Sequence, residues 1–150
     1  MNHMNEAVEI SVYNVLSKKG GPFGAVIVSP DNKVISTGSN LVTYKNDPTA
    51  HAEVIAIRNA CQKLKTPFLD NCTIYTSCEP CPMCYGAIKW AKIKNIFYAN
   101  TREDAKNIGF DDNLIYDDII NKTQNMKRID NKDAIKAFQL WNKLKDKKEY

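Results

Sequence analysis

The stretch TSCEPCPMCYGAIKWA, residues 76–91, places Cys78, Cys81 and Cys84 at intervals of three. The part from Pro80 to Ala91 favours a helix, whose first turn would aim the sulfurs of Cys81 and Cys84 at one point. A helix N-terminus also lowers the pKa of a thiol, which keeps the sulfur in the thiolate form that a metal needs. The stretch therefore predicts a metal site at the beginning of a helix.

A histidine upstream can supply a third ligand. The chain has two histidines, and His3 lies in a terminus that is expected to fray, which leaves His51 in the segment DPTAHAE at 47–53. Zinc bound by sulfur and imidazole ligands is tetrahedral, so His51, Cys81 and Cys84 leave the fourth position open. An open position is typical of a catalytic zinc site rather than a structural one.

Glu53 follows His51 by two residues, and residues two apart in a helix interior point about 200° apart. Both can face one metal only at the beginning of a helix, with Asp47 as the N-cap and Pro48 at the first position. The sequence thus predicts two helix N-termini facing each other across one zinc ion. Glu53, as a carboxylate that is not a ligand, is placed to take a proton from metal-bound water and deliver it to a leaving group.

Other interpretations of the five cysteines stay open at this point. An iron–sulfur cluster needs a fourth thiolate, and no cysteine follows Cys84. A structural zinc could use Cys72 or Cys78, and Cys81 with Cys84 could form a redox pair, although such a pair gives no role to the upstream HAE segment. We expect Cys61 and Cys72 to be core residues and Cys78 to line the site without binding the metal.

Composition indicates an ordinary globular chain. With 150 residues, 43% hydrophobic and 25% charged, we expect residues 1–150 to form one domain. No apolar run suggests a signal peptide or a membrane span, and an odd number of cysteines argues against a disulfide framework, so we expect the cytoplasm. The formal charge of +4 is a weak signal for nucleic acid, because much of the excess lies in the final KLKDKKE, where lysines also favour a helix C-terminus.

The pattern of apolar residues predicts a mixed sheet of five strands sandwiched between helices, an α/β/α class of fold. Val8, Val12, Val15 and Leu16 recur at helical spacing in the first helix, and a stripe from Ala134 to Leu144 suits a last helix packed on the sheet. The expected helices span residues 5–18, about 48–64, 80–91 and the C-terminal stripe. The expected strands span residues 22–28, 33–37, 72–77, 95–99 and 126–129, and the first two form a hairpin. Residues 102–121 show less pattern.

The combination of His51-Ala52-Glu53 with Pro80-Cys81-Pro82-Met83-Cys84 matches the signature H-x-E followed by P-C-x-x-C. On these residues the chain, from about Gly21 to Ala99, resembles the cytidine and deoxycytidylate deaminase superfamily. The resemblance implies the family's three-layer fold, a zinc cofactor, and hydrolytic removal of an exocyclic amine as ammonia, with Glu53 as the proton shuttle.

The resemblance narrows the substrate to a few classes. GGPFGAVIV, NDPTAHAE and TSCEPCPMCYGAI are similar to both bacterial guanine deaminases and transfer-RNA adenosine deaminases, whereas GFDDNLIYDDI at 109–119 and the final KKEY look like guanine deaminases. The implied reaction is guanine to xanthine and ammonia. The alternatives are adenosine in transfer RNA, guanosine or cytosine, and a non-catalytic binding module with the same fold.

The closer resemblance also implies substrate contacts at Asn40, Asp112 and Tyr150, with Phe23 and Trp90 as apolar or aromatic walls. It further implies a homodimer with an exchanged C-terminal segment, in which Tyr150 completes the pocket of the partner. Plainer roles stay open: Asn40 could end a hairpin strand, Asp112 could lie in a turn or a helix cap, and Tyr150 could be a disordered end. Phe23 and Trp90 could equally belong to the core.

Overall fold

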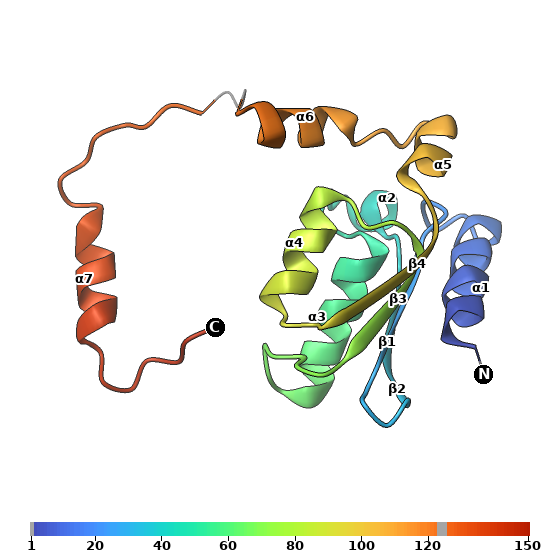
Figure 1. Cartoon of the computed structure of the whole chain (residues 1–150), viewed down its shortest axis with the longest axis horizontal. Helices are drawn as coiled ribbons and strands as arrows, with labels where there is room; N and C mark the ends of the chain where they lie inside the picture. Colours follow the sequence, from blue (N-terminus) through green and yellow to red (C-terminus); the bar gives the residue numbers. More distant parts are fainter. Residues whose placement is uncertain (1, 123–125) are drawn as a thin grey trace.

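A computed structural model describes residues 2–122 and 126–150. Its described part contains a four-stranded sheet in the order β2-β1-β3-β4, with α1 on one face and α3 and α4 on the other (Figure 1). The β1–β2 and β1–β3 pairs are antiparallel and β3–β4 is parallel, so the predicted mixed sheet in an α/β/α arrangement is confirmed. The elements are α1 (His3–Leu16), β1 (Gly24–Val28), β2 (Val34–Ser39), α2 (Val42–Lys45), α3 (Ala52–Leu64), β3 (Thr73–Cys78), α4 (Pro82–Trp90), β4 (Asn95–Asn100), α5 (Arg102–Asn107), α6 (Asn113–Asn121) and α7 (Ile135–Lys143).

The predicted fifth strand at 126–129 is wrong. These residues form no strand, and Met126 and Ile129 are exposed. Two apolar side chains in four residues suggested a strand, but strand formation also needs the edge of a neighbouring strand to pair with.

None of the helices described is long and apolar enough to cross a membrane.

The predicted helix at the N-terminus is present, but its buried face is not the predicted one. The residues that face the sheet are His3, Ala7, Ser11 and Asn14, whereas Val12 and Leu16 are 53% and 75% exposed. The cause is the closeness of α1 to β1, since a Cβ added at Gly24 would lie 2.3 Å from the backbone oxygen of Ala7. At that separation only small side chains fit between the helix and the strand.

Small residues also bring α3 close to β2. A Cβ at Gly38 would lie 2.2 Å from the Ala52 carbonyl oxygen and 2.5 Å from the Ala56 nitrogen. Beside this contact, the Ser36 hydroxyl donates a hydrogen bond of 2.7 Å to the Ala56 carbonyl. The main core continues from here between the sheet and α3 and α4, and it includes Ile27, Ile74, Ile88 and Ile93 together with the alanines of α3. The position of α3 on the sheet is therefore fixed by backbone contact.

The helix that carries the HAE segment begins four residues later than predicted. Asp47 is not its N-cap; the Asp47 carboxylate accepts hydrogen bonds from the Thr49 nitrogen at 2.8 Å and the Thr49 hydroxyl at 2.6 Å, which closes a turn. His51 is the N-cap of α3, in extended backbone conformation, and Glu53 lies in the first turn. An aspartate followed by proline satisfies either a cap or a turn, and here the turn forms.

The C-terminal third of the chain lies outside the layered body as an arm of three helices, α5 to α7 (Figure 1). The stretch 102–121, which has little apolar pattern, forms two helices, α5 and α6. A capping box of Thr101 and Asp104 begins α5. The prediction that the last helix packs on the sheet is wrong for this chain's own sheet, because α7 has no buried residue and Phe138 is 73% exposed.

Candidate metal centre and active site

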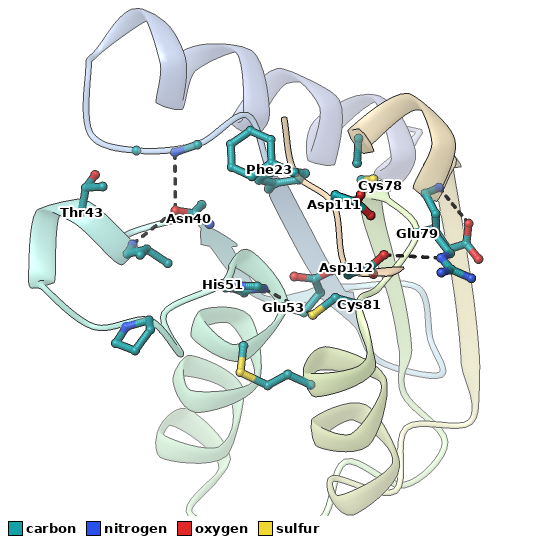
Figure 2. Close-up of a pocket in the computed structure, with 18 of the residues that line it drawn as sticks. Phe23, Asn40, Thr43, His51, Glu53, Cys78, Glu79, Cys81, Asp111 and Asp112 are labelled. Atoms are coloured by element: carbon teal, nitrogen blue, oxygen red, sulfur yellow. Dashed lines mark hydrogen bonds and ion pairs between the residues drawn. The ribbon is translucent and has the colours of Figure 1, made fainter. Parts of the chain in front are cut away.

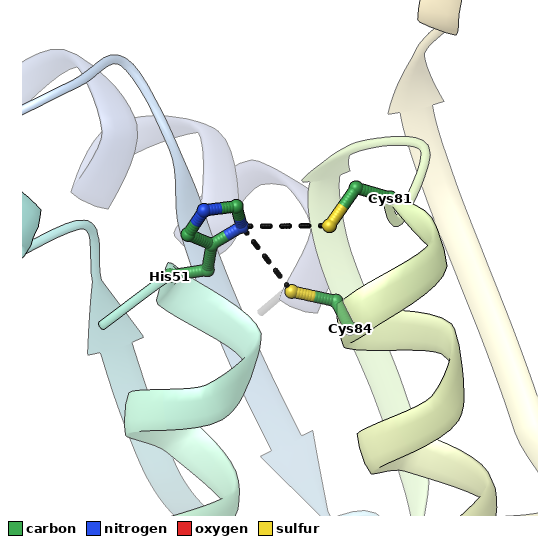
Figure 3. A group of neighbouring side chains, drawn as sticks. All are labelled: His51, Cys81 and Cys84. Atoms are coloured by element: carbon green, nitrogen blue, oxygen red, sulfur yellow. Dashed lines mark hydrogen bonds between the residues drawn. The ribbon is translucent and has the colours of Figure 1, made fainter. Parts of the chain in front are cut away.

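The three predicted metal ligands lie together at the ends of two helices (Figure 3). His51 is the N-cap of α3, Cys81 is the N-cap of α4, and Cys84 lies in the first turn of α4. The His51 Nδ1 is 3.5 Å from the sulfur of Cys81 and 3.5 Å from that of Cys84, and the three ligand atoms all lie within 4.8 Å of one another. The predicted arrangement of two helix N-termini facing one point is confirmed in its geometry.

The charges of this cluster suit a cation. A hydrogen bond from Cys84, with His51 close by, lowers the pKa of Cys81 to about 4, whereas the Cys81 sulfur, burial and Glu53 raise the pKa of Cys84. The hydrogen bond to Cys81 raises the pKa of His51. Two sulfurs and an imidazole thus share protons at close range, and a bound zinc ion would displace the Cys84 proton and be held by both thiolates. The donor set, two sulfurs and one nitrogen, is one that zinc prefers.

Glu53 points to the same place but is not part of the ligand group. Its side chain is buried, with Oε2 accepting from the Cys84 sulfur at 3.4 Å and Oε1 lying 3.2 Å from the Thr76 hydroxyl. Burial raises the pKa of the Glu53 carboxyl, which makes it a better proton acceptor than an exposed carboxylate.

A cavity of about 760 Å³ opens above this cluster (Figure 2). Its floor carries His51, Glu53 and Cys81. The other residues that line it are Lys18, Gly20, Gly21, Phe23, Asn40, Val42, Thr43, Pro48, Cys78, Glu79, Met83, Arg102, Ala105, Phe110, Asp111, Asp112 and Ile115. A large, mainly apolar cavity with a few polar groups and perturbed pKa values at its floor has the character of an active site.

A family model described as the cytidine and deoxycytidylate deaminase zinc-binding region matches residues 1–100. The chain belongs to this deaminase family. The family is zinc-binding, and the cluster of His51, Cys81 and Cys84 gives this member a group able to hold the ion.

Two relatives of this deaminase match different shares of the chain. The guanine deaminase of Bacillus subtilis is 48% identical over the whole of both chains, and its crystal structure superimposes with a TM-score of 0.93 over 100% of this chain and 99% of that one. The tRNA-specific adenosine deaminase of Haemophilus influenzae is 44% identical, but over 77 residues, or 51% of this chain and 44% of that protein. Only the first likeness extends through the arm.

Three of the five substrate contacts expected for this deaminase line the cavity. Phe23 packs edge to face on Phe110, with ring centroids 5.0 Å apart. Asn40 is buried at the end of the hairpin, where its Oδ1 accepts from the backbone nitrogens of Val42 at 3.2 Å and Gly21 at 3.4 Å. Asp112, half-buried, immediately precedes α6.

Trp90 and Tyr150 do not reach this chain's own cavity. Trp90 ends α4, 66% exposed, about 12 Å along the helix axis from the metal-facing end. Its ring centroid lies 6.2 Å from that of Tyr150, which is also exposed. The expectation that Trp90 forms a wall is therefore wrong for the pocket of the same chain, because the ligands occupy the opposite end of the helix. Tyr150 does not line the cavity of its own chain.

The remaining cysteines have the expected surroundings. Cys72 is buried in the main core and Cys61 packs against it. Cys78 lines the cavity, and its sulfur donates to the Thr101 carbonyl at 3.6 Å. Burial raises the pKa of Cys78 to about 11, so it stays a neutral thiol.

Four charged residues of the cavity were not predicted from the sequence: Lys18, Glu79, Arg102 and Asp111. Glu79 lies inside the CEPC run itself, where a polar side chain between two site cysteines is a usable signal. Arg102 gave no such signal, since it is separated from the motif by the whole of β4. Arg102 reaches the site because β4 pairs in parallel with β3, which places Asn100 opposite Cys78 and the beginning of α5 beside the site.

Proposed function

We propose that the chain catalyses the hydrolytic deamination of guanine to xanthine and ammonia. The observation that carries this proposal is the full-length likeness to the Bacillus subtilis guanine deaminase, which includes the arm that supplies Asp112 to the cavity. The match to the tRNA-specific enzyme of Haemophilus influenzae covers about half of the chain and therefore gives less support to that substrate.

In this proposal His51, Cys81 and Cys84 hold zinc. The ion, when bound, supplies the Lewis acidity that turns a water molecule into a nucleophile at neutral pH. Glu53 takes the proton of that water as it adds to the ring carbon bearing the amino group, and then delivers a proton to the amine, which leaves as ammonia. One water molecule is consumed for each guanine, and its oxygen becomes the new carbonyl oxygen of xanthine. The support for these roles is the geometry of the cluster and the buried carboxyl beside it.

Substrate selection falls to Phe23, Asn40 and Asp112. The Phe23 ring offers an apolar face to a flat base. The Asn40 amide can both donate and accept hydrogen bonds, while the Asp112 carboxylate accepts them from ring N–H groups. Guanine carries such donors, whereas a base that presents an acceptor at the same place would set that acceptor against a carboxylate oxygen with no proton between them, which is a basis for rejection.

We also propose that two copies form a homodimer by exchanging their C-terminal segments, so that Tyr150 of one copy closes the cavity of the other. The support is the separation of α7 from the body, together with the exposure of Phe138 and Trp141 on α7 and of Leu144 at its C-cap. An apolar stripe of this kind is usually covered in the functional assembly. Residues 1–150 would act as a single deaminase domain, and five unpaired cysteines support a cytoplasmic location.

Ammonia release tests the proposal. Purified, zinc-loaded protein is offered guanine, guanosine, cytosine, adenine and transfer RNA in parallel. Release from guanine alone is expected. Release from transfer RNA alone would keep the zinc cluster and Glu53 but refute the roles of Asp112 and Tyr150, and a zinc-loaded protein inactive on every substrate would indicate a binding module.

A further inference from the structure

We propose that Arg102 is a positioning residue that fixes the Asp112 carboxylate relative to the metal cluster and so sets the affinity for the purine. The inference rests on the proposed function, because it gives Asp112 the task of recognising the substrate. Arg102 itself acts through Asp112.

The guanidinium of Arg102 contacts three residues at the beginning of α6. Its Nε lies 3.5 Å from Asp112 Oδ1, and its Nη2 donates a hydrogen bond of 2.9 Å to the side-chain oxygen of Asn113. The Arg102 Cζ lies 3.4 Å from the centre of the Tyr116 ring, as expected for a stacked cation. The planar guanidinium thus contacts Asp112, Asn113 and Tyr116, which belong to the beginning of α6, and these contacts together hold the Asp112 carboxylate in place.

The backbone of Arg102 is tied to the loop that carries the metal ligands. Its nitrogen donates to Glu79 Oε2 at 3.0 Å, and Glu79 lies between Cys78 and Cys81 (Figure 2). The Glu79 nitrogen in turn donates to the Asn100 carbonyl at 2.8 Å, next to the sulfur-to-carbonyl contact of Cys78. The beginning of α5 is therefore held against the metal loop, the segment from Cys78 to Cys81. The side chain of Arg102 in turn sets the position of Asp112 relative to this loop.

Asp112 has few other restraints. The α6 helix has no buried residue, and the linker before it passes through Gly109 in a left-handed conformation, with φ of 97°. The contact of Phe110 with Phe23 steadies the linker, but it acts two residues before the carboxylate. An exposed ion pair contributes little to stability, but the Arg102 and Asp112 side chains are only 33% and 20% exposed. The Arg102 Nε is buried and has no hydrogen-bond partner among the described residues, so its 3.5 Å contact with Asp112 is an ion pair and not a hydrogen bond. The pair is thus partly desolvated at the edge of the cavity, where orientation has most effect on binding.

A double-mutant cycle on guanine turnover tests this role. Arg102→Ala should lower kcat/KM by about 10- to 100-fold, mainly through KM, with the zinc content unchanged. Arg102→Lys should recover little of the loss, because an ammonium group cannot stack flat on Tyr116 while it also contacts Asn113 and Asp112. In an Asp112→Ala background, Arg102→Ala should cost less than about threefold, since the group that it positions is absent.

Lys33→Ala is the matched control. It removes an ion pair with Asp31, 2.8 Å long, in the turn between β1 and β2, and should leave kcat/KM unchanged. Full multiplication of the two losses in the Arg102 and Asp112 double variant would refute the positioning role, and so would loss of zinc in Arg102→Ala. A zinc-loaded wild type that releases no ammonia from guanine would instead refute the proposed function, and the inference with it.

Discussion

Replacing Gly38 by alanine should displace α3 and with it the metal ligand His51. The new methyl group would lie 2.2 Å from the Ala52 carbonyl oxygen and 2.5 Å from the Ala56 nitrogen, both in the backbone of α3. Ordinary contacts of a Cβ begin at 3.4 Å, so α3 has to move away from β2 by more than an ångström. His51, as the N-cap of α3, moves with it, while the cysteines of α4 stay.

The size of the effect follows from this displacement. Overpacking of a close contact costs about 1–3 kcal/mol of unfolding free energy. For a chain of this size that corresponds to a melting temperature lower by about 3–10 °C. A catalytic group misplaced by about 1 Å costs on the order of 100-fold in rate, so turnover should fall further than stability.

The measurement is a thermal melt, a zinc determination and guanine turnover on purified Gly38→Ala. Gly86→Ala is the control, because a Cβ at this α4 position meets nothing within 4 Å. Alanine in a helix interior is favoured over glycine by about 1 kcal/mol, so this variant should melt slightly higher and keep its activity. Wild-type melting and turnover in Gly38→Ala would refute the idea that backbone contact between β2 and α3 fixes the metal cluster.

Four further tests address the floor of the cavity, its wall, the C-terminal segment and the metal. Glu53→Gln should keep zinc but lose about 10²- to 10⁴-fold in turnover, and full zinc with undiminished turnover would show that another group moves the proton. Asn14→Ala should cost about 2–4 kcal/mol in a denaturant melt, because the Asn14 amide donates at 2.8 Å to the carbonyls of both Gly21 and Asn40; an unchanged midpoint would refute this. Deleting Lys148–Tyr150 should lower guanine turnover about tenfold or more with an unchanged melt, and unchanged kinetics would contradict a role for Tyr150 in the partner's cavity. Removal of zinc by a chelator should abolish turnover and lower the melting temperature, and added zinc should restore both.

The metal cluster could be predicted from sequence because its chemistry is local. A C-x-x-C pair on one helical turn and a histidine with a nearby glutamate leave few arrangements that serve one ion, and the structure brings His51, Cys81 and Cys84 together. The order of strands and helices up to β4, apart from the one-turn helix α2, was predictable for a similar reason, since the longer elements each show a period of their own.

What the sequence did not show depends on distances between elements. The valine stripe of α1 has a helical period, but the face that contacts the sheet is chosen by the room above Gly24, which admits Ala7 and Ser11. The apolar stripe of α7 likewise indicated a helix correctly without indicating which molecule's surface it would meet. Arg102 was missed because its role exists only once β4 has returned the chain beside the metal loop.

The cavity joins two regions with very different mutational freedom. Its floor belongs to the core, where Glu53 is buried against β3 and a change of one methyl group is felt. Its outer wall belongs to α6 and the linker before it, which are exposed and contribute nothing to the core. Substitutions from 108 to 121 can therefore accumulate without threatening the fold or the bond-breaking machinery. Divergence toward new amino-bearing bases, natural or engineered, is most accessible through this segment, and a library confined to it would sample specificity while sparing catalysis.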